Sequence, residues 1–274
     1  MLRILLNNYK KVLTLLLIGF LLLGNVVQTN TSFADTVEHI KITVGEVTET
    51  TNKVEIPAWQ QRDCDILIRV GEWGNETTVK KGKRVYIDNG VSWKRIPTDI
   101  PIHKDSKGYY IQEFDINKKI ATKVYNELIK NGVNAKLQIA NGRTEDLNAA
   151  GRIANESNPK LYLSIHTNCY NGKANGYFSM YNQGSEIGKG IANRLSSSIE
   201  NNGMVARTQN RSQNGYIGEL NVLNGSTCGV LMELGFFDNY EELVNICSDK
   251  YANYVGVHLA KEIKSVLNDY WKKY

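Results

Sequence analysis

The sequence has few cysteines and histidines and lacks closely spaced cysteine pairs. It contains four residues of each type and no Cys-x-x-Cys pair. We therefore expect the cysteines to be small, buried apolar residues rather than metal ligands. If two disulfides formed after export, three pairings would be open. The chain also shows no internal repeat and no basic stripe, so a nucleic-acid partner is not expected.

Long apolar runs are absent beyond the N-terminus. Near the start, three basic residues precede an apolar stretch at 12–27, and Ser32-Phe-Ala34 offers small residues at the usual cleavage spacing. This pattern predicts a secretory signal peptide at residues 1–34, and an uncleaved signal anchor is the alternative. Removing these residues would leave 33 − 3 = 30 basic against 28 acidic side chains. We expect the mature chain to be secreted.

The rest of the chain divides by its hydrophobic pattern. Residues 35–83 show little helical periodicity and are predicted to form a linker and a short β appendage. From residue 84 on, apolar strand-like runs alternate with helical repeats of apolar residues. Strands are expected at 66–70 in the appendage, then at 84–88, 133–139, 160–165, 176–181 and 229–234. Helices are expected at 113–131, 147–155, 187–199 and 240–270, the last with an interruption near Ser248. A surface loop is expected at 203–220. The alternation predicts an α/β domain at 84–274, with a mostly parallel sheet covered by helices on both faces.

Two of the predicted strands carry groups that bind or assist metals. His166 closes the run Leu161-Tyr-Leu-Ser-Ile-His166, and Glu233 lies inside the apolar run at 229–234. A carboxylate in such a run is costly unless a metal, a donor or a proton compensates it. Because ligands bind beyond the carboxyl ends of parallel strands, we expect both residues near one crevice. Glu113 begins the first predicted helix, where the helix dipole favours an acidic side chain.

Four sequence blocks together resemble a known family. Glu113, Arg152-Ile-Ala-Asn155, Ser164-Ile-His-Thr-Asn168 and Glu233-Leu-Gly-Phe-Phe-Asp-Asn239 are similar, in order and approximate spacing, to the zinc-dependent N-acetylmuramoyl-L-alanine amidases of the Amidase_3 type. The resemblance spans about residues 84–270. It implies a peptidoglycan hydrolase in the cell wall or at the outer face of the membrane. That hydrolase would cut the amide between N-acetylmuramic acid and L-alanine of the stem peptide.

The resemblance also implies roles for individual residues. Glu113 and His166 resemble two ligands of a Zn²⁺ ion, and Glu233 resembles the catalytic glutamate. Asn168 and Asn239 are expected to hold loops through side-chain hydrogen bonds. Peptidoglycan is the expected partner, and a requirement for an activating protein partner stays open.

The pattern departs from the family at its first ligand. The family has a histidine just after the first strand, in an Asp-x-Gly-His context, whereas the run Ile87-Asp-Asn-Gly-Val91 places valine there. One hypothesis is that His103, on the loop before Glu113, replaces the missing zinc ligand. A second is that the chain is a catalytically silent, amidase-like protein that binds or regulates the wall. A third is that this copy of an otherwise active family carries a lesion.

Overall fold

The computed structural model describes residues 62–71, 76–81, 85–88, 93–95, 100–139, 147–200, 211–213 and 218–271. The predicted signal peptide and the linker up to residue 61 lie outside this range. Within the described part, no helix combines the length and the apolar composition needed to cross a membrane.

The larger sheet is mostly parallel, as predicted. Among the described residues it has six strands in the order β10-β9-β11-β8-β1-β7. Neighbouring strands run parallel except β11 and β9, which run antiparallel. The bounds are β1 (Ile66–Val70), β7 (Ala135–Gln138), β8 (Leu161–Asn168), β9 (Phe178–Asn182), β10 (Arg211–Gln213) and β11 (Cys228–Phe236). The short strand β10 and the helix α5 (Gly218–Asn221) occupy part of the stretch predicted as a loop at 203–220.

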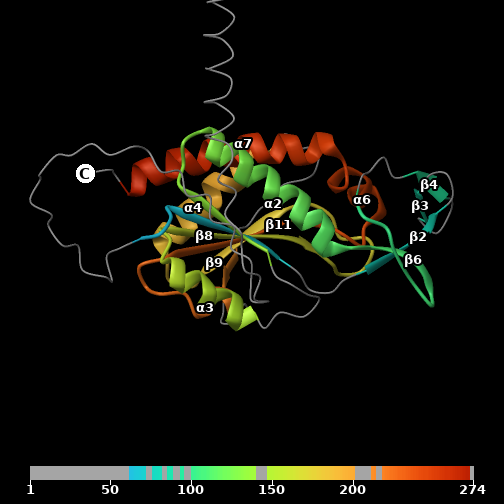
Figure 1. Ribbon diagram of the computed structural model, residues 1–274, viewed down its shortest axis with the longest axis horizontal. Helices are drawn as coiled ribbons and strands as arrows, with labels where there is room; N and C mark the ends of the chain where they lie inside the picture. The colour runs from blue at the N-terminus through green and yellow to red at the C-terminus, as the bar shows by residue number, and fades with distance from the viewer. Residues whose placement is uncertain are drawn as a thin grey trace, which may run out of the picture. The chain divides into compact units, whose positions relative to one another are not determined.

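Helices cover both faces of this sheet (Figure 1). On one face lie α2 (Glu113–Lys130), α4 (Glu186–Ser198) and α7 (Asp249–Tyr270), and on the other lie α3 (Leu147–Ser157) and α5 (Gly218–Asn221). The helix α6 (Tyr240–Ile246) follows β11. Two residues after its end, Ser248 caps the start of α7, because its side chain accepts a hydrogen bond from the Tyr251 backbone N–H. The α/β class predicted from the hydrophobic pattern is therefore confirmed.

The alternation of side chains in β1 explains the two-sided core. Ile66 and Ile68 pack in the large cluster that includes residues of α2 and α7, whereas Leu67 packs in a second cluster with Ala154 of α3 and Leu220 of α5. This is the period of two expected of a strand that is buried on both faces. Both faces of β1 are thus covered, as in a central strand of an α/β sheet.

A second, antiparallel sheet precedes α2 in the chain. Its strands are ordered β4-β3-β2-β6-β5. They are β2 (Glu76–Lys81), β3 (Val85–Asp88), β4 (Trp93–Arg95), β5 (His103–Asp105) and β6 (Gly108–Gln112). The last of these strands leads directly into Glu113 at the start of α2.

These two sheets correct the predicted assignment of the first strand. The stretch at 84–88 was expected to open the α/β sheet, but β3 pairs with β2 and β4 in the antiparallel sheet. The strand at 66–70, assigned to the appendage, is β1 and pairs with β7 and β8 in the parallel sheet. Both runs are short and apolar, and the side chains of β1 pack on both faces of its sheet. The expected boundary between residues 83 and 84 therefore falls inside the antiparallel sheet.

Candidate active site

His166 and Glu233 are direct neighbours across two strands. In the register of β8 and β11, Glu233 lies opposite His166, near the carboxyl ends of both strands. His166 is fully buried and Glu233 is 7% exposed. A register shift between Glu233 and Phe236 follows at once, so the regular pairing of the strands is interrupted at this edge. The sheet therefore places an imidazole beside a carboxylate at the edge where α/β proteins bind ligands.

Glu113 reaches the same point from the start of α2. Its Oε1 lies 3.6 Å from His166 Nδ1, and both side chains are fully buried. Asn117, one helical turn further on, donates from Nδ2 to Glu113 Oε1 at 3.0 Å and to the Gly71 carbonyl oxygen at 2.8 Å. Asn117 thus ties the carboxylate of α2 to the end of β1. Asn117 was not among the predicted site residues, although its spacing of four residues from Glu113 on one helix is a usable signal.

A second carboxylate faces the other nitrogen of the imidazole. Glu219 of α5 places Oε1 3.4 Å from His166 Nε2. Its Oε2 accepts a hydrogen bond from the Tyr162 hydroxyl at 2.9 Å and lies 3.4 Å from Arg69 Nε. Arg69 and Glu219 are both fully buried. Neither was predicted, although an arginine inside the apolar run 66–70 signals a buried partner.

The charges in this cluster shift one another's protonation. Burial raises the pKa of Glu233 to about 7, even though nearby His166 opposes the shift. Burial alone would lower the pKa of His166, but Glu113 and Glu219 outweigh it and raise that pKa. Burial would raise the pKa of Glu219, but His166 and Arg69 outweigh it and lower that pKa. The carboxylates on either side of the imidazole thus stabilise its charged form.

The end of β1 packs directly on His166. A Cβ placed on Gly71 would overlap the imidazole ring, and the Gly71 N–H donates to the Ile165 carbonyl at 2.9 Å. The first strand of the parallel sheet ends within the run Arg69-Val-Gly-Glu72, and this run matches the family's Asp-x-Gly-His pattern better than the run ending at Val91. Glu72 then stands at the sequence position of the missing histidine. Glu72 and Val91 both lie outside the described residues.

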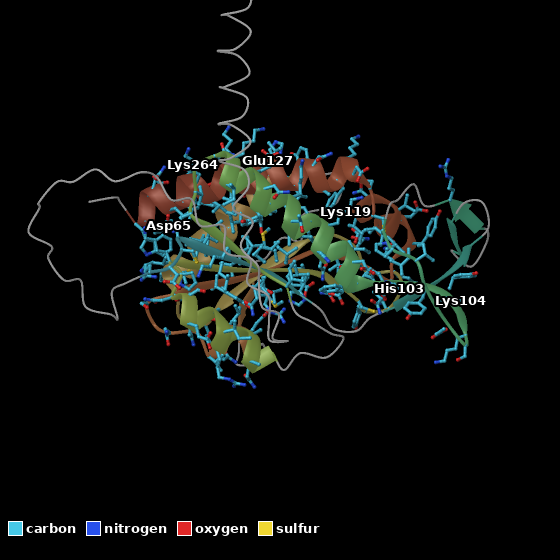
Figure 2. The ribbon with its side chains drawn as sticks, viewed as in Figure 1. Asp65, His103, Lys104, Lys119, Glu127 and Lys264 are labelled. Carbon is cyan, nitrogen blue, oxygen red and sulfur yellow. The ribbon has the colours of Figure 1, made fainter. Side chains whose placement is uncertain are left out.

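His103 does not join His166 and Glu113. Its Nε2 lies 2.6 Å from Asp115 Oδ2, and its ring stacks on Tyr110 of the neighbouring strand. Figure 2 labels it on the strand segment that precedes α2. Across the described part of the chain, no group of three or more His, Cys, Asp or Glu side chains could hold a metal ion.

The two ligands that do meet fit a metal in part. Two ligands of a tetrahedral zinc ion, each bonded at about 2.0–2.1 Å, stand roughly 3.3 Å apart. The 3.6 Å between Glu113 Oε1 and His166 Nδ1 is close to that spacing. A carboxylate at the other ring nitrogen is the usual companion of a metal-binding histidine, and Glu219 fills that position. The described residues thus supply two ligands and their support, and a catalytic zinc needs a third.

The loops beside the site are held by polar side chains, as predicted for two asparagines. Asn168 Oδ1 accepts from the Cys169 N–H, and Asn239 Nδ2 donates to the Ala174 carbonyl while its Oδ1 caps α6. Asp238 Oδ2 accepts from the backbone N–H groups of Tyr170 and Gly172. The loop after His166 is therefore fastened to the loop after β11.

The cysteines carry no disulfide, because all four are free thiols. Cys64 and Cys247 are buried, as expected for small apolar residues, whereas Cys169 is exposed.

Comparisons with known proteins find similarity to N-acetylmuramoyl-L-alanine amidases. The family model described as N-acetylmuramoyl-L-alanine amidase matches residues 102–265, which is more than half of the chain. A germination-specific N-acetylmuramoyl-L-alanine amidase of Bacillus subtilis (strain 168) is 28% identical over 126 residues, covering 44% of this chain and 50% of that protein. The chain therefore aligns with about half the length of this curated relative.

Two solved structures share the fold at low sequence identity. An N-acetylmuramoyl-L-alanine amidase of Clostridium difficile 630 gives a TM-score of 0.54 at 20% identity, over 76% of this chain and 97% of that one. The CwlD amidase of Clostridioides difficile, solved in complex with the GerS lipoprotein, gives 0.54 at 19% identity, over 75% and 99%.

The fold is thus that of the peptidoglycan amidases. The chain belongs to the N-acetylmuramoyl-L-alanine amidase family of the Amidase_3 type.

Proposed function

We propose that this chain hydrolyses the amide bond between the lactyl group of N-acetylmuramic acid and L-alanine of the peptidoglycan stem peptide. The observation that carries the proposal is the convergence of Glu113 and His166 next to Glu233. These three side chains come from three separate elements, and all are buried at the carboxyl edge of one sheet. Three ionisable groups gathered in this way need a compensating function, and hydrolysis uses all of them.

Glu113 and His166 would hold a zinc ion through Oε1 and Nδ1. When bound, zinc lowers the pKa of a water molecule and polarises a carbonyl oxygen. Asn117 orients the Glu113 carboxylate by its hydrogen bond, and Glu219 faces the imidazole nitrogen that points away from Glu113. The chain's own contribution is therefore to fix both ligands before substrate arrives.

Glu233 would act as the acid–base group. It takes a proton from the attacking water and passes it to the nitrogen of L-alanine as the amide C–N bond breaks. The products are the free lactyl carboxylate of muramic acid and a stem peptide with a free amino terminus. Burial suits this role, since it raises the pKa of Glu233 to about 7, near the working pH of a general base.

The second candidate is a catalytically silent, amidase-like protein that binds or regulates the wall. One observation favours it: the described residues supply only two metal ligands, while Arg69 brings a buried cation into the same cluster. The two candidates share a substrate class and differ in turnover. Export and a protein partner, such as the lipoprotein bound by the CwlD amidase, are further proposals.

A soluble substrate separates the candidates. Purified residues 35–274 would be incubated with N-acetylmuramoyl-L-alanyl-D-isoglutamine and zinc, and the products followed by liquid chromatography and mass spectrometry. The hydrolase yields N-acetylmuramic acid and the free dipeptide, whereas the silent protein leaves the substrate intact. A His166→Ala variant serves as the control for a contaminating amidase.

A further inference from the structure

Arg69 is the least expected residue of the cluster. It lies in β1 opposite Ser164 of β8 and Gln138 of β7, and it is among the largest fully buried side chains of the described chain. It follows Leu67 by two residues, so its side chain points to the face covered by α3 and α5. A guanidinium buried on that face requires an anion, because isolated buried charges are strongly unfavourable.

Glu219 is that anion, and the fold fixes its position. A Cβ on Gly151 of α3 would overlap the Glu219 carbonyl oxygen, so α3 and α5 are in close contact at this point. Asn182 Nδ2 donates to the Leu220 carbonyl at 3.1 Å, and Asn155 Nδ2 donates to the Val222 carbonyl at 2.7 Å. These hydrogen bonds therefore hold the backbone next to Glu219 from two sides, independently of the Glu219 carboxylate.

The two carboxylate oxygens of Glu219 contact different partners. Oε2 lies 3.4 Å from Arg69 Nε and accepts from the Tyr162 hydroxyl at 2.9 Å. Oε1 lies 3.4 Å from His166 Nε2. The remaining ring nitrogen, Nδ1, then faces Glu113. A chain of contacts runs from Arg69 through Glu219 to the ring orientation of His166.

We propose that Arg69 is a positioning residue that acts through Glu219 to hold the His166 ring with Nδ1 toward Glu113. This inference rests on the proposed function in one respect, namely that His166 Nδ1 is a metal ligand. The proposed action of Arg69 is exerted through Glu219, whose Oε2 lies 3.4 Å from Arg69 Nε, and does not require contact with the substrate or the metal. The Arg69 guanidinium compensates the charge of the Glu219 carboxylate, which can therefore stay buried beside His166 Nε2. The carboxylate in turn orients the ring.

A double-mutant cycle tests the path of action. The variants are Arg69→Met, Glu219→Gln and the pair combined, and zinc affinity is measured by competition with a chromogenic chelator. We expect each single change to weaken binding about 10- to 100-fold, the range for lost partners of metal ligands. In the Glu219→Gln background, Arg69→Met should change affinity less than about threefold, because its route to His166 is already cut. Additive losses, or single variants that bind like the parent, would overturn the proposal.

Two further variants guard against simple unfolding. Tyr162→Phe removes only the hydroxyl that donates to Glu219, and it should weaken zinc binding less than Arg69→Met does. Arg194→Met removes ion pairs to Glu262 and Asp269 between α4 and α7, outside the site, and should leave zinc affinity unchanged. If Arg69→Met fails to fold, the comparison of Tyr162→Phe with Arg194→Met decides, and equal affinities in these two variants would contradict the proposal.

A second measurement does not depend on zinc. The chain has four histidines, so the ring nitrogens of His166 can be resolved by long-range proton–nitrogen NMR in the metal-free protein. The proposal predicts a slowly exchanging proton on Nε2 in the parent and in Arg194→Met, and its loss or fast exchange in Arg69→Met. An unchanged signal in Arg69→Met would refute the positioning role. A parent protein that shows this signal but binds no zinc would instead refute the metal site.

Discussion

Gly71 and His166 are in such close contact that no side chain fits between them. A methyl group at Gly71 would overlap Nε2, Cδ2 and Cε1 of the imidazole ring. The backbone of Gly71 is itself held, because its N–H donates to Ile165 and its carbonyl accepts from Asn117. Gly71 cannot move away without breaking these bonds, so a side chain at position 71 would have to displace the His166 ring.

Replacing Gly71 by alanine should therefore displace the His166 ring. We expect a loss of about 1–3 kcal/mol in the free energy of unfolding, the usual cost of overpacking, and at least a tenfold loss of zinc affinity. Gly225→Ala is the matched control, since a Cβ there meets nothing within 4 Å. Urea unfolding and chelator competition on both variants measure the two effects. Equal behaviour of the two variants would show that His166 is not held by this contact.

Glu233→Gln should remove hydrolysis and keep the fold. The amide has nearly the same shape but cannot accept the proton of water, so we expect the rate to fall about 10²- to 10⁴-fold. Because burial of this carboxylate is unfavourable, the melting temperature should stay level or rise. Retained zinc binding with lost turnover would support the acid–base role. Turnover within threefold of the parent would exclude Glu233 from it.

The structure and the sequence hypothesis make opposite predictions for His103→Ala. The hypothesis requires this variant to lose zinc, whereas the contact of His103 with Asp115 predicts unchanged zinc stoichiometry. His166→Ala should lose the metal in either case. Inductively coupled plasma mass spectrometry on the dialysed proteins distinguishes them, and loss of zinc from His103→Ala would restore His103 as a ligand.

Position 72 is a better place than position 91 to restore the family's histidine. Gly71 lies on His166, and the next Cα in the chain is about 3.8 Å further on. We therefore expect Glu72→His to raise zinc affinity at least tenfold, or to keep it as high as in the parent protein, and Glu72→Ala to lower it. Val91→His should have no effect. Stronger binding in Val91→His alone would show that the register of the first ligand was assigned to the wrong strand.

Alkaline pH should destabilise the fold through the buried thiol of Cys64 and the partly buried thiol of Cys228. Burial raises the pKa of Cys64 and of Cys228 from 9.0 to about 12. Above pH 9 these thiols lose their protons in the unfolded chain but keep them in the folded chain. The free energy of unfolding is therefore unaffected by them below pH 9 and falls as pH rises toward 12. The limiting slope is about 1.4 kcal/mol per pH unit for each thiol. Urea unfolding between pH 8 and 11 should show a smaller slope in Cys64→Ala/Cys228→Ala, and identical slopes would contradict the prediction.

Much of the fold could be predicted because its periodicity is strong. The spacing of Ile116, Ile120, Val124 and Leu128 matches α2, and all four side chains are fully buried. The break near Ser248 was visible as well, since serine there caps α7. The stretches 66–70 and 84–88 were exchanged because both are short apolar runs, and strand pairing over long sequence distances decides which one enters the sheet.

The site could be predicted where the residue stands in an apolar strand or in a block that matches the family. His166 and Glu233 followed from their apolar runs, whereas Glu113 followed from the family resemblance, because an acidic residue at a helix start is ordinary by itself. Glu219 could not be found in this way, because it belongs to a helix of four residues inside a stretch that resembles a loop. Arg69 was passed over because its strand was assigned to the appendage. Correct placement of β1 would have drawn attention to a charged residue in a central strand.

The most direct test of the account is product analysis on its natural polymer. Purified peptidoglycan would be digested with residues 35–274 and zinc, beside the Glu233→Gln variant, and the soluble products identified by mass spectrometry. The account predicts free stem peptides that begin with L-alanine and glycan strands with unsubstituted muramic acid, from the parent only. Intact peptidoglycan after treatment with folded, zinc-loaded parent protein would contradict it, and binding without cleavage would identify the chain as a silent member of the family.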